Sequence, residues 1–282
     1  MNDPRPRCAM FALSLVFLSF SAANGQQIEW LTDLDHARQT AVRTGKPILY
    51  DFTAKWCGPC RRMDKDFWTK PEVIELSKQF VCVKVDFDRE KTLAARYDIK
   101  AIPNVVFTDP WGRGLGGQKG FGSSTENEIL QKINFLPKDF TPLLEAGKAL
   151  ETDEKNLNAL HSFAAFYQER RIFWLGNLFY NRLIKIESDP SKREMVFLNL
   201  AFNHLREGEP EDAIDKLSVL QKEFPSSPQG DLYLYGLIVA NANKNKKQEA
   251  ATLLTELKKK FPKSKYSDAA ESAVANIPEW KR

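Results

Sequence analysis

Hydrophobic positions in the first half of the chain follow two different periods. Apolar residues three and four positions apart predict a helix over residues 34–41, which Gly45 and Pro47 end. Short apolar runs predict strands at residues 48–52, 80–86 and 104–107, with a last strand inside the glycine-rich stretch 114–122. Helical spacing predicts further helices after residue 57 and around residues 71–76, 93–97 and 129–133. Strands that alternate with helices in this way are typical of an α/β layered sheet.

From about Pro142 onward the strand-like runs end, and apolar residues recur at helical spacing alone. Residues 213–227 and 250–264 resemble each other at an offset of 37 residues, with Ala, Leu, Leu, Phe and Pro at matching places. A fainter copy begins near Gly176. Paired helices repeated about every 34 residues are typical of tetratricopeptide repeats, which this half resembles with a longer period and an incomplete aromatic consensus. A non-repeating helical bundle stays open as the alternative.

The N-terminus differs from the rest of the chain. Two arginines precede an apolar run over residues 9–22, and small residues follow it. This order predicts a secretory signal peptide over residues 1–25, cleaved after Ala23 or Gly25. The apolar run has 14 residues, which is short for a membrane span of about 20, although an uncleaved anchor stays open. We therefore expect the mature protein outside the cytoplasm, in the periplasm or the extracellular space.

Composition and charge narrow the range of functions. A chain of 282 residues is long enough for two ordinary domains, and its 43% hydrophobic and 28% charged residues are typical of a globular protein. The net charge is only +4, and lysines and arginines are spread among the acids. Because nucleic-acid binding needs a basic face, we expect no nucleic-acid partner.

The cysteines point to redox chemistry. Cys8 leaves with the signal peptide, and Cys82 lies in an apolar run where we expect a small buried hydrophobe, not a third redox partner. Cys57 and Cys60 form a Cys-x-x-Cys motif, which occurs in both redox and zinc sites, and a structural zinc site needs four ligands. The only histidines are His36, His161 and His204. Without a second Cys-x-x-Cys, the motif favours a redox pair, and we expect no metal.

A strand, a tight turn and a helix around the motif place Cys57 at a helix N-terminus. Unpaired N–H groups and the helix dipole there favour thiolate over thiol, and the thiolate is the attacking species in disulfide exchange. Cys60 lies one helical turn further in, where it can resolve a mixed disulfide on Cys57. Gly58 allows the turn, and Pro59 suits the first turn of the helix.

Two segments of the chain resemble thioredoxin. Residues 51–61, Asp-Phe-Thr-Ala-Lys-Trp-Cys-Gly-Pro-Cys-Arg, are similar to its active-site segment. Residues 97–107, Tyr-Asp-Ile-Lys-Ala-Ile-Pro-Asn-Val-Val-Phe, are similar to the segment that holds its cis-proline. The resemblance covers about residues 29–136. It implies an α/β thioredoxin fold, a central mixed sheet flanked by helices, over residues 26–138, and an all-α helical-repeat domain then fills residues 139–282.

The resemblance also implies roles for particular side chains. Cys57 would be the nucleophile and Cys60 the resolving cysteine. Asp51 would be a buried acid that helps to move the Cys60 proton, and burial should raise the pKa of such a carboxyl. Lys84 matches the lysine near that acid. A partly exposed Asp51 at a strand end, with no part in catalysis, stays open.

A substrate-binding surface around the cysteines is implied as well. Its residues would be Trp56, Gly58, Pro59, Ile102, Pro103 and Gly120. The Ile102–Pro103 bond would be cis, with backbone groups of Ile102 offered to the substrate. Trp56 could equally serve as packing. The chain departs from the family pattern at Ala101, Asn104 and Arg61, and we expect these changes to affect partner choice more than chemistry.

These features together predict an extracytoplasmic enzyme that exchanges disulfides with client proteins, with the cysteine pair as its only redox group. Residues 63–85 resemble the secreted thioredoxin relatives and the C-terminal domain of the bacterial transmembrane disulfide reductase. The Gly-Pro dipeptide favours a reductant, which would need a membrane thiol as its electron donor. An isomerase or an oxidant stays open. So does a redox-quiet adaptor that binds a protein partner through its helical repeats.

Overall fold

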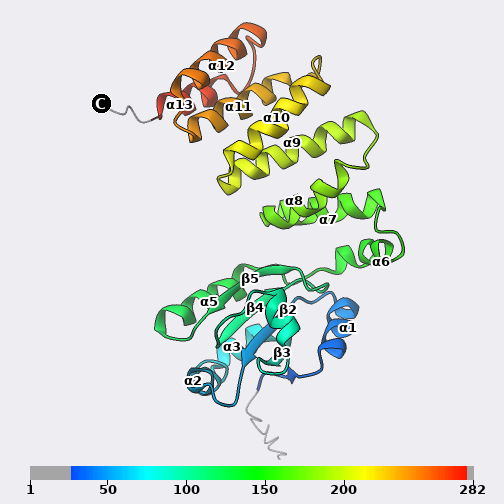
Figure 1. The fold of residues 1–282 in the computed structure, drawn as a ribbon, viewed down its shortest axis with the longest axis vertical. Helices are drawn as coiled ribbons and strands as arrows, with labels where there is room; N and C mark the ends of the chain where they lie inside the picture. Colours follow the sequence, from blue (N-terminus) through cyan, green and yellow to red (C-terminus); the bar gives the residue numbers. More distant parts are fainter. Residues whose placement is uncertain (1–26, 278–282) are drawn as a thin grey trace, which may run out of the picture.

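A computed structural model describes residues 27–277 of the chain. The predicted signal peptide and Cys8 lie outside these residues, so they stay predictions. Within the described part, no helix has both the length and the apolar character that a membrane span requires. Figure 1 shows a sheet with helices on both sides, followed by a run of helices that stacks away from it.

The N-terminal half holds a mixed five-stranded sheet in the order β1-β3-β2-β4-β5. Its strands are β1 (Trp30–Leu31), β2 (Ile48–Thr53), β3 (Val81–Asp86), β4 (Asn104–Thr108) and β5 (Gly114–Lys119). β1 and β2 run parallel to β3, while β4 is antiparallel to both β2 and β5. This confirms the expected sheet. The two-residue β1 was not predicted, because it is too short to show a period.

Helices cover both faces of the sheet. They are α1 (Leu34–Thr44), α2 (Gly58–Asp66), α3 (Pro71–Ser77), α4 (Lys91–Arg96) and α5 (Ser123–Phe135). The Asp33 carboxylate caps α1 by accepting hydrogen bonds from two backbone N–H groups of its first turn. Gly45 ends this helix in the left-handed conformation, as the sequence predicts.

The alternation of side chains along β2 separates two cores. Ile48, Tyr50 and Phe52 pack with α1 and α4 on one face. Leu49 packs on the other face with residues of α2, α3 and α5. Asp51 follows Leu49 by two positions, so its carboxyl faces the α2 side. This central strand is covered on both faces, which explains why its sequence is a nearly continuous apolar run with one acid.

The C-terminal half is made of helices. It begins with a 3-10 turn (Thr141–Leu143) and continues through α6 (Leu144–Thr152), α7 (Leu157–Glu169), α8 (Phe173–Leu183), α9 (Pro190–Glu207), α10 (Pro210–Glu223), α11 (Gly230–Asn243), α12 (Lys247–Lys260) and α13 (Ser267–Ala275). Each helix from α7 to α12 packs on the next, and Figure 1 shows the stack lengthening away from the sheet. The two similar segments of the sequence coincide with α10 and α12 and the turns that follow them.

The turn between β4 and β5 joins the two halves. Trp111 packs edge-to-face on Phe163 of α7, with ring centroids 5.0 Å apart. The Tyr167 hydroxyl, also on α7, donates a hydrogen bond to Asp109. Gly147 of α6 lies so near the Trp111 ring that a Cβ there would come within 2.4 Å of it. The core on this side of the sheet therefore continues from β4 into α7 and α8.

Candidate active site

Cys57 and Cys60 form a disulfide at the start of α2. Cys57 is the N-cap residue, and its Sγ accepts a hydrogen bond from the backbone N–H of Cys60 at 3.2 Å. Pro59 lies in the first helical turn, where its missing N–H has no intrahelical partner to lose. This is the place where a helix terminus stabilises a negatively charged sulfur. The structure therefore puts both predicted cysteines where the expected exchange chemistry requires them.

Asp51 lies on β2, the strand that leads into the active-site turn, and only 2% of its surface is exposed. Its Oδ2 accepts a hydrogen bond from Trp68 Nε1 at 3.0 Å and another from the Lys84 ammonium. Lys84 sits directly across from Asp51 on β3. Among the described residues, Asp51 Oδ1 has no hydrogen-bond partner although it is buried.

The surroundings of Asp51 act on its pKa in opposite directions. Burial has the largest effect and raises the pKa of the carboxyl above its ordinary value of 3.8. The charge and hydrogen bond of Lys84 lower it, the charge of Asp64 raises it, and the hydrogen bond from Trp68 lowers it. The pKa is raised on balance, because desolvation outweighs the ammonium. Such a carboxyl can take and return a proton nearer to neutral pH than an exposed aspartate can.

The predicted substrate-binding backbone lies beside the disulfide. The Ile102–Pro103 peptide bond is cis. Ile102 packs against Ala54 and both cysteines. The backbone N–H of Gly120 donates to the Pro103 carbonyl at 2.8 Å. Gly120 has φ +80°, a conformation that favours glycine, and a Cβ there would meet no atom of the described part of the chain within 4 Å. The structure thus brings Gly120 next to Pro103, with open space on its outer side.

Trp56 precedes the disulfide and is 64% exposed. Its indole N–H donates to Asp88 Oδ2 at 2.7 Å, which fixes the ring without burying it. Arg61 donates to the backbone carbonyl of Lys55 at 2.7 Å and so holds the turn from the other side. Gly58 opens α2, and a Cβ there would lie 3.9 Å from the end of the Arg61 side chain. A large exposed aromatic ring beside a reactive sulfur is a suitable contact for a protein client.

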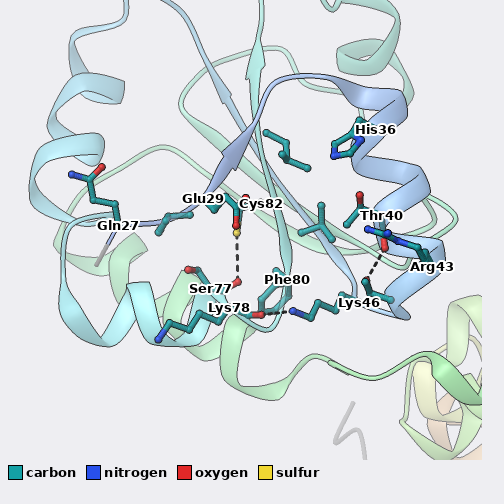
Figure 2. A pocket seen from close by; sticks show the side chains of 14 residues that line it. Gln27, Glu29, His36, Thr40, Arg43, Lys46, Ser77, Lys78, Phe80 and Cys82 are labelled. Atoms are coloured by element: carbon teal, nitrogen blue, oxygen red, sulfur yellow. Dashed lines mark hydrogen bonds between the residues drawn. The ribbon is translucent and has the colours of Figure 1, made fainter. Parts of the chain in front are cut away.

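Cys82 lies apart from this pair. Its thiol is 4% exposed, and the thiol donates a hydrogen bond to the Ser77 carbonyl at 3.6 Å. It lines a cleft of about 500 Å³ together with His36, Arg43 and Lys46 (Figure 2). Burial raises the pKa of the Cys82 thiol to about 12. A thiol in this state is not a nucleophile at neutral pH, in agreement with its expected structural role.

The described residues contain one group of three side chains placed to hold a metal ion, and it does not include the cysteine pair. The group consists of His204, Glu207 and Glu209, whose ligand atoms lie within 4.8 Å of one another. His204 Nδ1 is already hydrogen-bonded to Glu209 at 2.7 Å. The group belongs to the end of α9 and the start of α10, in the repeat half.

Sequence reasoning missed three side chains around Asp51 and Lys84. Trp68 binds the Asp51 carboxylate, Asp64 binds the Lys84 ammonium, and Trp30 lies under that ammonium with its ring centroid 4.4 Å from Nζ. One signal was available for two of them. Asp64 and Trp68 follow Cys60 by four and eight positions, the spacing of one helix face. Trp30 carries no such signal, because it comes from a distant strand.

Family models match both halves of the chain. A model described as thioredoxin-like matches residues 29–110, and a tetratricopeptide repeat model matches residues 195–227 and 232–264. The repeat interpretation of the second half is therefore right over these residues. The fainter copy near Gly176 lies outside both matches, although α8 there packs on α7 and α9 as a repeat helix would.

Several curated proteins are similar to the N-terminal half. The thioredoxin of Mycoplasmoides gallisepticum is 35% identical over 92 residues, which are 33% of this chain and 86% of that protein. A thioredoxin H-type of Oryza sativa subsp. indica is 37% identical over 78 residues, which are 27% of this chain and 59% of that protein. A probable protein disulfide-isomerase A6 of Medicago sativa is 28% identical over 126 residues, which are 45% of this chain and 33% of its own length. The chain thus spans most of the first relative and a little over half of the second.

Solved structures are similar to the same half. The oxidised mitochondrial thioredoxin 3 of Saccharomyces cerevisiae is 27% identical, with a TM-score of 0.32, over 39% of this chain and 95% of that one. A poplar thioredoxin h is 26% identical, with a TM-score of 0.31, over 38% of this chain and 96% of that one. By its matched relatives and its cysteine pair, the chain belongs to the thioredoxin family of thiol–disulfide oxidoreductases, with tetratricopeptide repeats in its second half.

Proposed function

We propose that the protein works outside the cytoplasm and reduces disulfides in client proteins. One observation carries the proposal: the Cys57–Cys60 pair caps α2, and the strand leading into it holds a buried Asp51, one of whose carboxyl oxygens has no hydrogen-bond partner among residues 27–277. The Gly-Pro dipeptide between the cysteines, shared with thioredoxin, supports the reducing direction. The basic and apolar pattern of the first 25 residues supports export.

The reaction starts from the reduced pair. The Cys57 thiolate attacks one sulfur of the client disulfide, which forms a mixed disulfide and releases the other client sulfur as a thiolate. Cys60 then gives its proton to Asp51, and its thiolate attacks Cys57 Sγ. The second client sulfur leaves as a thiolate, and both client thiolates take protons from water. Two electrons pass to the client, and the Cys57–Cys60 disulfide of this structure is the product.

A membrane thiol donor would then restore the reduced pair by the reverse exchange. The disulfide accepts two electrons and two protons from a dithiol, which becomes a disulfide itself. An exported reductant needs such a donor, because an oxidising compartment offers no reducing thiol pool of its own.

The helical repeats supply a second contact surface for a protein partner. A cleft of about 510 Å³ lies on α9, α11 and the start of α13. Three aromatic rings stack along it, with centroids 6.5 Å apart between Phe202 and Tyr235 and 5.2 Å apart between Tyr235 and Tyr266. Rigid aromatic surface with amide groups beside it, here Gln168 and Asn199, suits an extended polypeptide.

The reduction potential of the cysteine pair tests the proposed direction. The purified protein is equilibrated with mixtures of reduced and oxidised glutathione, and the pair is followed by thiol alkylation. We expect a potential near that of thioredoxin, about −270 mV. A value near about −120 mV would instead identify an oxidant. The Cys82→Ala variant should give the same potential, which controls for the third thiol.

The double variant Cys57→Ser, Cys60→Ser separates an enzyme from an adaptor. We expect it to lose all disulfide exchange and the cellular role that depends on it. If the double variant keeps that role together with its protein partner, the repeats act alone and the chain is an adaptor.

A further inference from the structure

Lys84 lies between two carboxylates of very different exposure. Its ammonium donates to Asp51 Oδ2 on the inner side and to Asp64 Oδ1 on the outer side. The side chains of Asp51, Lys84 and Asp64 are 3%, 19% and 45% exposed. These three groups therefore form a continuous charged path from the interior of the sheet to the surface of α2.

Two indole rings confine the ammonium of Lys84. Its Nζ lies 4.4 Å from the centroid of the Trp30 ring and 5.9 Å from that of Trp68. The rings themselves meet edge-to-face at 5.2 Å, and Trp68 is also hydrogen-bonded to Asp51. Aromatic faces favour the charged form of an amine and leave it few other positions. Lys84 is thus confined between the two indole rings, with Asp51 on its inner side and Asp64 on its outer side.

Two clefts open onto the outer end of this path. One, of about 690 Å³, is lined by Thr53, Ala54 and Arg61, and the other, of about 510 Å³, by Trp30 and Trp68. Both clefts share Asp64 and Lys84 in their walls, and Asp51 lines neither of them. Water therefore reaches the Lys84–Asp64 pair directly, while Asp51 meets solvent through that pair.

We propose that Asp64 is a positioning residue of the oxidoreductase, which holds Lys84 so that Asp51 can accept the Cys60 proton and return it to water. This inference rests on the proposed exchange reaction at Cys57 and Cys60. Asp64 acts through Lys84 and touches neither cysteine nor client.

The role of Asp64 follows from the two states of Asp51. When Cys60 gives its proton to the Asp51 carboxylate, a thiolate and a neutral carboxylic acid result. Lys84 then loses the charge of its inner partner while most of its side chain stays buried. A buried ammonium without a negatively charged partner is unfavourable. Asp64 remains paired with Lys84 when Asp51 is protonated, and it thereby lowers the free energy of that state. The proton finally leaves Asp51 for water in the clefts, and the carboxylate pairs with Lys84 again.

The charges around the path favour transfer of the Cys60 proton to Asp51. Asp64 raises the pKa of Asp51, whereas Lys84 and Trp68 lower it. The thiol of Cys82 on β3 also interacts electrostatically with Asp51, and the neighbour of Asp51 on β4 is the apolar Val105. The charged residues that line the larger cleft around Lys84 and Asp64 are Lys55, Arg61, Asp86, Arg89 and Glu90.

The test separates the two steps of disulfide exchange in the purified full-length protein. The reduced protein is mixed with an equal amount of 5,5′-dithiobis(2-nitrobenzoate), and release of the coloured thiolate is followed by stopped flow from acid to alkaline pH. The first phase reports attack by Cys57, and the second reports attack by Cys60 on the mixed disulfide. Cys8→Ala and Cys82→Ala are present in every protein, so that only the pair reacts.

We expect Asp64→Asn to slow the second phase at neutral pH by about threefold to tenfold, part of the 10²–10⁴-fold that proton transfer contributes to catalysis. Its pH midpoint should move to lower pH, because Asp51 becomes a weaker base. The first phase should not change. Asp64→Glu, which restores the carboxylate, should recover most of the rate.

Asp66→Asn is the matched control, because it removes the same charge from the same helix at an exposed position. It should leave both phases unchanged. A second phase in Asp64→Asn with the rate and pH midpoint of the parent protein would overturn the role of Asp64, even if the exchange itself proceeds. A parent protein that shows neither phase would instead overturn the exchange reaction, and the inference with it.

Discussion

Asp51 on β2 and Asp109 after β4 are two buried carboxyls of the same sheet, with 2% and 0% of their surfaces exposed. Their hydrogen bonds differ. Asp109 Oδ1 accepts from the backbone N–H groups of Trp111 and Arg113 at 2.9 and 2.8 Å, and its Oδ2 accepts from Arg113 Nε at 2.5 Å and from the Tyr167 hydroxyl. Asp51 places both of its bonds on Oδ2 and leaves Oδ1 unpartnered among the described residues.

The partners of the two carboxyls explain what each region does. Arg113 lies among the rings of Trp111, Phe163 and Phe179, at 4.4 to 5.0 Å from their centroids. Asp109 thereby connects the sheet to α7 and α8 through the Tyr167 hydroxyl and the Arg113 guanidinium. Asp51 instead meets an ammonium that also binds a surface carboxylate. A saturated buried acid holds two halves of a fold together, and an unsaturated one can take a proton.

The largest loss of stability is expected at Asp109, whose two carboxyl oxygens both accept hydrogen bonds. Asp109→Ala removes the carboxylate that pairs with a largely buried guanidinium and also leaves the Tyr167 hydroxyl without its acceptor. We expect the free energy of unfolding to fall by about 3–5 kcal/mol, as for other broken buried ion pairs. Urea denaturation followed by circular dichroism measures this. Glu145→Ala, which removes an exposed partner of Lys148 on α6, should cost almost nothing, and an equally small loss for Asp109→Ala would refute its structural role.

A smaller loss of stability is expected when only the hydrogen bond between the two halves is removed. Tyr167→Phe keeps the ring, which stacks at 5.9 Å on Phe179, and removes only the hydrogen bond to Asp109. A hydrogen bond to a charged group contributes about 1.5–3 kcal/mol, so we expect a loss of about 2 kcal/mol in urea denaturation. The rate of disulfide exchange by the cysteine pair should be unchanged in the folded variant. A changed exchange rate would mean that the repeats control the active site.

The active site could be read largely from the sequence because its parts are local. Cys57 and Cys60 share one helical turn, and Ile102 and Pro103 are neighbours, so short motifs contain them. The strands β2, β3 and β4 were predicted for a similar reason, since each is a short, mostly apolar run. Such features depend on residues that lie close together in the chain.

The contacts between distant segments could not be read in this way. Tyr167 follows Asp109 by 58 positions, so no short motif contains both residues. Trp30 reaches Lys84 because β1 pairs with β3, yet β1 has only two residues and shows no period. Nothing in a single sequence specifies which surfaces of the sheet and the repeats meet, because that choice depends on packing of whole faces.

The smallest expected change in the free energy of unfolding is a gain, and it concerns Asp51. Its raised pKa means that the folded state binds the proton more tightly than the unfolded chain does. The wild type therefore loses stability as pH rises from the unfolded value near 3.8 to the raised folded pKa, and the loss remains above that range. Asp51→Asn removes this penalty and keeps a side chain of similar volume. We expect it to be more stable at neutral pH, although its second exchange step is slower.

Urea denaturation of both proteins between pH 3 and pH 8 checks the sign of this effect. The two stabilities should coincide at the acid end, where Asp51 is protonated in both the folded and the unfolded state, and diverge as pH rises. The same comparison with Asp109→Asn provides the contrast, because that variant loses stability at neutral pH by removing a saturated partner of Arg113. If Asp51→Asn is instead destabilised at neutral pH like Asp109→Asn, then Asp51 is held mainly by its ion pair with Lys84, and its free oxygen does not mark a proton-transfer site.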